Sequence, residues 1–243
     1  MKDILIIGDS CRDIFVYCDS YRLAPDVPVP ILNVKNQTEN SGMAKNVQRN
    51  ISQYMECDII TNSNWYDVTK TRYVHDKTNH MFCRVDSNTT IPGIERINDI
   101  RLDNYNLIVI SDYNKGFLSK YDIETICKNH TNVILDTKKL LGKWAEDAAY
   151  IKINDFEYSN SKKTITSALE GKIIHTIGGD GCIFNEKTYP VTRVDVKDTS
   201  GAGDSFMAAL CIKYLQTENI IESIEFANKC ASEVVKYRGV TTI

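Results

Sequence analysis

The segment 198–206 reads D-T-S-G-A-G-D-S-F and carries the residue types best suited to chemistry. Gly201, Ala202 and Gly203 directly precede an amphipathic run, so their backbone N–H groups lie at a predicted helix N-terminus, where anions bind. Asp204 falls in the first helical turn, where its carboxylate can accept a proton from an attacking hydroxyl group. A glycine-rich loop capped by an acidic residue has the same letters, because Asp is common in first turns. If only the G-x-G spacing is considered, the capped loop is the favoured interpretation.

Two other places carry polar residues that serve either chemistry or local structure. Asp13 follows the apolar run at residues 4–7, and a lone aspartate after a strand is often a turn former. Asn154 and Glu157 lie three residues apart, which is also the spacing of a helix-capping box. Taken alone, the Asn154 and Glu157 pair is explained equally well by capping and by a functional site.

Short apolar runs recur along the chain and are followed by turn residues, which is typical of strands buried on both faces. Stretches with apolar residues every three or four positions fill the gaps and predict helices. Strands that alternate with helices indicate a parallel sheet covered on both faces. The predicted strands cover 4–7, 107–110, 133–135 and 173–177, and the predicted helices fall within 43–55, 123–127, 206–215 and 220–234.

Two segments, 14–34 and 71–85, depart from this alternation. They carry alternating, β-branched and aromatic residues, and the first contains Pro25, Pro28 and Pro30. We expect them to form antiparallel strands outside the main sheet, as a small lid. Without an internal repeat or a long linker, residues 1–243 are expected to form a single domain that carries this lid.

Charge and composition exclude several classes of protein. The 243 residues have a formal net charge of −3, without the basic excess of a nucleic-acid-binding protein. No stretch approaches the roughly 18 apolar residues of a membrane span, and we expect neither a span nor a secretory signal. The eight cysteines show no repeating spacing and no C-x-x-C, so we expect reduced thiols in a cytoplasmic protein without structural zinc.

The complete string at 198–204 resembles the D-T-x-G-A-G-D signature of the ribokinase-like (PfkB) carbohydrate kinases. Three more motifs resemble that family in the same order: the segment 8–13, N-x-x-E at 154–157 and T-x-G-x-x-G at 176–181. The resemblance implies a ribokinase-like three-layer α/β sandwich with a mostly parallel central sheet and a small β lid. It also implies transfer of the γ-phosphoryl group of ATP to a sugar hydroxyl, with Mg²⁺.

The family's motifs imply roles for individual residues. Asp204 would be the catalytic base, and the N–H groups of Gly201, Ala202 and Gly203 would hold the charge of the transferring group. The resemblance implies nucleotide contacts from Thr176, Gly178, Gly181, Asp198 and Asn228, sugar contacts from Asp13, Gly42, Asn46 and Lys115, and a Mg²⁺ ion held through water by Asn154 and Glu157.

Within the family, residues 22–30 (R-L-A-P-D-V-P-V-P) resemble a stretch of the heptose-7-phosphate kinases of the lipopolysaccharide heptose pathway. Strings at 71–74, 84–86, 111–116 and 136–138 and the closing segment 227–242 resemble the same kinases. This likeness implies a heptose 7-phosphate-like substrate and a homodimer formed through the lid. A kinase for another sugar or nucleoside, or a non-catalytic sugar- or nucleotide-binding relative, remains an alternative.

The sequence also departs from those kinases. Met43 stands where they carry a second glycine, so we expect its side chain to project into the sugar pocket or to displace the chain. The stretch 57–66 is shorter than theirs, which predicts that one edge unit of the sheet is missing. The chain ends where the bifunctional enzymes begin a nucleotidyltransferase domain, and we expect that second activity to be absent.

Overall fold

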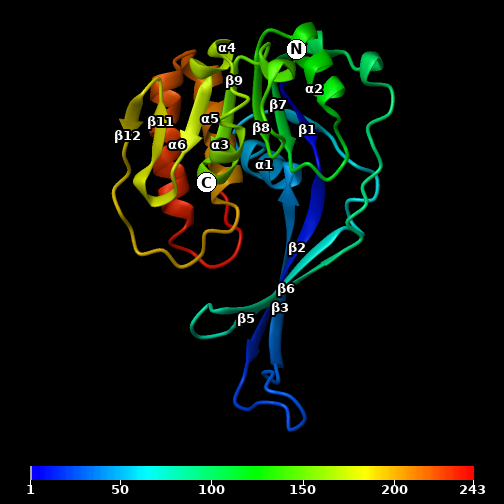
Figure 1. Ribbon diagram of the computed structural model, residues 1–243, viewed down its shortest axis with the longest axis vertical. Helices are drawn as coiled ribbons and strands as arrows, with labels where there is room; N and C mark the ends of the chain where they lie inside the picture. The colour runs from blue at the N-terminus through cyan, green and yellow to red at the C-terminus, as the bar shows by residue number, and fades with distance from the viewer. Residues whose placement is uncertain (1) are drawn as a thin grey trace.

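An eight-stranded sheet forms the body of the molecule (Figure 1). The computed structural model describes residues 2–243. The strands are β1 (Lys2–Gly8), β4 (Cys57–Ile60), β7 (Tyr105–Asp112), β8 (Val133–Thr137), β9 (Tyr150–Asn154), β10 (Ile173–Thr176), β11 (Cys182–Phe184) and β12 (Lys187–Tyr189). Their order is β12-β11-β10-β9-β8-β7-β1-β4, with parallel pairing from β4 to β10 and an antiparallel hairpin, β11 and β12, beyond β10.

Alternate residues of the central strands face two separate hydrophobic clusters, so the sheet is the middle of three layers. In β1, Leu5 and Ile7 belong to one cluster, whereas Ile4 and Ile6 belong to the other. The predicted three-layer α/β architecture is confirmed. Helices α1 (Ala44–Ile51), α5 (Ala202–Thr217) and α6 (Ile220–Val234) pack on the Ile4 side, and α2 (Lys120–Asn129), α3 (Asp155–Ser161) and α4 (Ser167–Glu170) pack on the Leu5 side.

A second sheet of four strands projects from the body as a narrow lid (Figure 1). Its order is β3-β2-β5-β6, formed by β2 (Ser10–Asp19), β3 (Asn33–Met43), β5 (Thr69–His75) and β6 (Met81–Ser87). Only Asp9 separates β1 from β2, so the lid continues directly from a central strand of the body. Short 3₁₀ turns occur at η1 (Ile97–Asp99), η2 (Leu102–Asn104), η3 (Lys143–Ala145) and η4 (Gly178–Asp180).

The lid differs from the sequence prediction in two respects. Residues 20–32 are a loop at the far end of the lid rather than strand, with a single bridge between Leu23 and Pro30. The pairing of β2 with β5 is parallel, so the prediction of antiparallel strands is wrong for this pair. The reason is the path of the chain: it returns to the body for α1 and β4 and enters the lid again from the body, so both strands run outward.

Strand β4 is the last strand on its side of the main sheet, next to β1. Between α1 and β5, β4 is the only helix or strand that the described residues contain. This lateral edge of the main sheet is therefore built from one short strand. Within residues 2–243, no helix has the length and apolar character needed to cross a membrane.

Candidate active site

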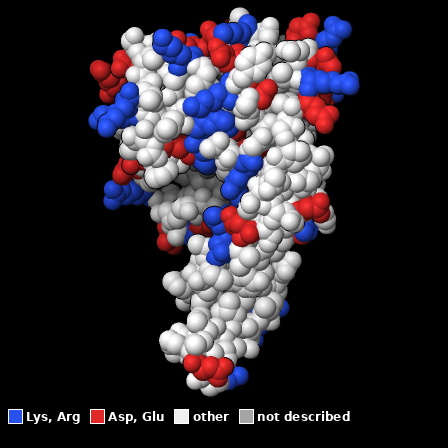
Figure 2. All heavy atoms as spheres, turned by 45° about the vertical axis from the view of Figure 1, so that its right-hand side comes forward, with Lys and Arg blue, Asp and Glu red and all other residues white. Residues whose placement is uncertain are grey.

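The parallel strands end at the edge of the body that faces the lid (Figure 1), and three charged residues lie at or near these strand ends. Asp112 ends β7, Asp136 lies near the end of β8, and Lys152 lies near the end of β9. All three are buried. Ligands of open α/β sheets bind at this edge. Figure 2 shows the surface hollowed where the lid leaves the body, with Lys and Arg side chains beside the hollow.

Asp204 is the best candidate for a catalytic base. It lies in the first turn of α5 and is 5% exposed. One carboxylate oxygen accepts a hydrogen bond from Asn46 Nδ2 at 2.9 Å and the other accepts one from the Tyr113 hydroxyl at 2.6 Å. Burial raises the pKa of Asp204 to about 6, while the Tyr113 and Asn46 hydrogen bonds oppose that rise. A carboxylate with this pKa is ionised at neutral pH and is a stronger base than an exposed aspartate.

The glycine-rich loop before Asp204 has the shape that an anion site requires. Gly201 has φ 78°, and a Cβ on it would lie 3.0 Å from Asn46 Nδ2, so only glycine fits. The Ala202 N–H donates within the loop to the Thr199 carbonyl. Among residues 2–243, the N–H groups of Gly203 and Asp204 have no backbone acceptor. These two N–H groups are available to an anion.

A buried cation lies beneath this loop. Lys152 Nζ is 2.8 Å from Asp136 Oδ2, and a Cβ on Gly203 would lie 3.2 Å from that ammonium group. Burial disfavours the charge on Lys152, yet the Asp136 carboxylate holds the pKa of Lys152 above its ordinary value. The N-terminus of α5 therefore has an ammonium group paired with Asp136 directly behind it, and the helix dipole adds to the attraction for a phosphate group there.

The predicted sugar residues surround the base of the lid. Asp13 accepts a hydrogen bond from the Arg72 guanidinium at 2.6 Å. A Cβ on Gly42 would lie 2.3 Å from Asp13 Oδ2, so Gly42 makes room for that carboxylate. Asn46 is buried against Asp204. Lys115 is half-buried, and its side chain has no carboxylate partner among the described residues.

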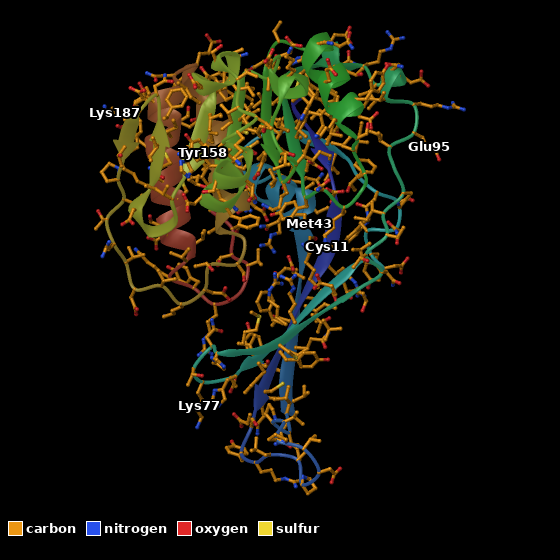
Figure 3. All side chains as sticks on the ribbon, viewed as in Figure 1. Cys11, Met43, Lys77, Glu95, Tyr158 and Lys187 are labelled. Atoms are coloured by element: carbon orange, nitrogen blue, oxygen red, sulfur yellow. The ribbon has the colours of Figure 1, made fainter. Side chains whose placement is uncertain are left out.

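Met43 lies at the boundary between lid and body, beside Cys11 (Figure 3). Its backbone has φ 58° and ψ −132°, a conformation that favours glycine. Its side chain is 2% exposed and packs in the hydrophobic cluster on the Leu5 side of the sheet. Of the two expected outcomes, projection into the sugar pocket is therefore wrong, because the chain turns the side chain into the core. Displacement of the chain stays a prediction.

A cavity of about 600 Å³ lies beside α5 and α6, and most of the predicted nucleotide residues line it. Gly181 has φ 98°, and a Cβ there would lie 2.1 Å from the Tyr189 carbonyl oxygen. Asp198 is not part of this lining, because its carboxylate accepts from the N–H groups of Ser200 and Gly239 and so anchors the loop. The predicted residues on the cavity wall are Thr176, Gly178, Gly181, Asn228, Asn154, Ala202 and Gly203.

Asn154 and Glu157 form a helix-capping box, which is one of the two interpretations that their spacing allowed. The Asn154 side chain accepts from the Glu157 N–H at 2.9 Å, and Glu157 accepts from the Asn154 N–H at 2.8 Å. The Lys138 ammonium group also pairs with Glu157. No cluster of three or more His, Cys, Asp or Glu side chains in residues 2–243 could hold a metal ion. Both Glu157 oxygens already accept from Asn154 or Lys138, so the pair would reach Mg²⁺ only through water, and that role stays a prediction.

Sequence reasoning assigned no role to Tyr113, Arg72, Asp136 and Lys152, which the structure places against the predicted site residues. A lysine inside the apolar string Y-I-K-I-N was the available signal for Lys152, because a buried lysine needs a partner. No sequence signal was available for the contact of Tyr113 with Asp204, since 91 residues separate them.

Residues 102–243 match the pfkB family carbohydrate kinase, and the chain therefore belongs to that family of sugar kinases. The bifunctional protein HldE of Helicobacter pylori strain J99 is 28% identical over 297 residues, with 98% of this chain and 64% of that protein covered. The chain thus spans less than two thirds of that relative. The alignment is longer than the 243 residues of the chain, so HldE has additional residues within the matched region.

Solved structures share the fold. Ribokinase of Thermotoga maritima has a TM-score of 0.70 at 15% identity, with 99% of this chain and 95% of that chain covered. Arabidopsis thaliana ribokinase complexed with ribose and ATP has a TM-score of 0.70 at 13% identity, with coverage of 98% and 94%. The predicted ribokinase-like fold is confirmed.

Proposed function

We propose that this protein transfers the γ-phosphoryl group of ATP to a hydroxyl group of a phosphorylated sugar similar to heptose 7-phosphate. One observation carries the proposal. The buried Asp204 carboxylate lies in the same helical turn as the unpaired N–H groups of Gly203 and Asp204, between the cavity and the lid. In-line phosphoryl transfer requires a proton acceptor beside an anion site, and the first turn of α5 supplies both.

In the proposed reaction the sugar binds between Asp13 and Asp204, and Asp204 accepts the proton of the attacking hydroxyl. The free N–H groups at the start of α5 and the Lys152 ammonium group behind them stabilise the charge of the transferring group. Mg²⁺, held through water by Asn154 and Glu157, would neutralise phosphate charge. The cavity lined by Thr176, Gly178, Gly181 and Asn228 would hold the nucleotide.

The likeness to HldE supports a sugar phosphate as the acceptor. A cation near Asp13 also supports it, because Lys70 lies opposite Asp13 in the β2–β5 pairing. Lys70, like Lys115 after β7, has no carboxylate partner in the described chain. Unpaired, partly buried lysines favour an anionic ligand.

Release of ADP tests the proposal directly. The full chain is incubated with ATP and Mg²⁺ and one of four acceptors: heptose 7-phosphate, ribose, fructose or adenosine. We expect the highest kcat/KM with heptose 7-phosphate. ADP release that no acceptor raises above the sugar-free rate would overturn the kinase proposal, and a preference for an unphosphorylated acceptor would overturn the proposed substrate.

Replacement of the proposed base is the matched mutational test. Asp204→Asn is nearly isosteric but removes the proton acceptor, so we expect kcat to fall by roughly 10²- to 10⁴-fold while the Kd for ATP stays the same. Asp58→Asn is the control, since Asp58 also accepts a tyrosine hydroxyl but lies at the opposite end of the sheet. Near-normal turnover by Asp204→Asn, with chemistry rate-limiting, would show that another group is the base.

A further inference from the structure

The Asp204 carboxylate has one hydrogen-bond donor on each oxygen, and the donors differ in kind. Asn46 supplies a neutral amide from α1 at 2.9 Å. Tyr113 supplies a phenolic O–H from the segment after β7 at 2.6 Å, the shorter of the two bonds. A donor this close stabilises the ionised form of a buried carboxylate more than the protonated form.

The Tyr113 side chain is held from several directions. Its backbone N–H donates to Asp9 Oδ2 at 2.6 Å, at the junction of body and lid. Lys70 Nζ lies 4.9 Å from the centre of its ring, and Lys138 Nζ lies 5.0 Å from it. Lys70 belongs to lid strand β5, whereas Lys138 follows β8 and pairs with Glu157. The hydroxyl is therefore fixed against Asp204 by contacts to both body and lid.

The charges around this pair come from five elements. Burial, together with the nearby Asp204 charge, raises the pKa of Tyr113 well above its ordinary value, so the hydroxyl is protonated and remains a donor at neutral pH. The titratable and charged groups that face the pair are Arg49 of α1, Cys11 and Asp13 of β2, Lys70 of β5, Asp136 of β8 with Lys138 after it, and Lys152 of β9.

We propose that Tyr113 is a positioning residue, which keeps Asp204 ionised and oriented for proton transfer and connects that state to the lid through Lys70. The inference rests on the proposed role of Asp204 as the base. It assigns to the S-D-Y-N-K-G segment a function that its sequence did not reveal.

Tyr113→Phe tests the inference because it removes only the hydroxyl group. Loss of a hydrogen bond to a charged group moves the titration of Asp204 upward by about one pH unit. The low-pH limb of kcat, which reflects protonation of Asp204, is expected to move from near pH 6 to near pH 7, with normal turnover recovered at higher pH. Tyr105→Phe is the control: Tyr105 lies at the other end of β7 and donates to Asp58, also at 2.6 Å.

A direct readout separates this inference from the proposed function. Carboxyl ¹³C NMR of the aspartate-labelled chain follows the ionisation of Asp204 whether or not the protein turns over, and Asp204→Asn assigns its signal. We expect an upward shift in Tyr113→Phe, a smaller upward shift in Lys70→Met, and none in Tyr105→Phe. Lys70→Met also keeps the test available if Tyr113→Phe does not fold.

Two results would overturn the inference. One is an Asp204 titration that is identical in wild type, Tyr113→Phe and Lys70→Met. The other is a Tyr113→Phe variant with higher kcat at every pH, which would mean that the hydroxyl group blocks the acceptor. A wild-type chain without sugar kinase activity would refute the proposed function, while the NMR titration would still decide whether Tyr113 controls Asp204.

Discussion

At Met43 the backbone conformation is unfavourable, whereas the burial of the side chain is favourable. A backbone at φ 58° and ψ −132° costs a non-glycine residue about 1–3 kcal/mol. The side chain offsets this by packing in the core beside Cys11. The cost of the backbone strain is thus offset by apolar burial at the junction of lid and body, where the side chain is 2% exposed.

Substitutions of Met43 distinguish the two contributions. Met43→Ala loses the buried side chain and keeps the strain, whereas Met43→Gly loses the side chain and relieves the strain. We expect both to lower the free energy of unfolding, and we expect Met43→Gly to be the more stable variant by about 1 kcal/mol. Urea denaturation measures this order. At an ordinary helical position the alanine variant would be the more stable of the two. Neither variant should change the relative kcat/KM values across the sugar panel, and an Ala variant more stable than the Gly variant would contradict the strain.

At the scale of elements, the approach of β3 to β2 positions Asp13. Gly42 pairs with Cys11 across these strands, and its missing side chain leaves the space that the Asp13 carboxylate occupies. Arg72, from β5 on the other side of β2, then holds Asp13 by an ion pair. Three lid strands together fix one carboxylate at the base of the lid.

Gly42→Ala should therefore act on the sugar and not on the nucleotide. A new Cβ would lie 2.3 Å from Asp13 Oδ2 and 2.8 Å from Cys11 Sγ, so Asp13 must move. We expect the KM for the sugar to rise roughly 10- to 100-fold, while the KM for ATP is unchanged. Gly93→Ala is the control, since its Cβ meets only ordinary contacts at 3.7 Å and beyond. An unchanged sugar KM would argue against Asp13 as a sugar ligand.

Apolar runs were sufficient to predict β1, β7, β8, β10 and the long helices, because burial on both sheet faces leaves a continuous pattern. The sequence did not reveal β9, whose five residues include a charged lysine, or the parallel pairing of β2 with β5, which depends on the path of the chain through α1 and β4. The residues of the glycine-rich loop were predictable from local spacing. The contact between Tyr113 and Asp204 was not, since it joins distant segments of the chain.

For the whole molecule, the lid projects from the body and leaves two strand edges open (Figure 1). Its outer strands, β3 and β6, have no neighbouring strand beyond them among residues 2–243. Apolar side chains are exposed on both, including Val34, Met81 and Val85. Natural proteins usually cover such edges, which supports the expected pairing of two lids in a homodimer.

Sedimentation velocity at micromolar concentration tests the homodimer. We expect a species of twice 27.6 kDa for the wild type and a shift toward monomer for Val85→Lys, which places a charge on the lid edge. Tyr121→Lys, at an aromatic residue on α2 that is more exposed than Val85, serves as the control and should remain dimeric. A wild-type sample that contains only the 27.6 kDa species would refute lid-mediated pairing.

The burial of Asp204 also bears on what happens when ATP binds and no sugar is present. Water is the commonest competing nucleophile for any kinase, and it attacks only where a base can reach it. Asp204 is 5% exposed, and both of its oxygens already accept hydrogen bonds from Asn46 and Tyr113. Such a base has little contact with solvent. With ATP bound and no sugar present, we expect the enzyme to leave ATP intact until a sugar hydroxyl enters beneath the lid.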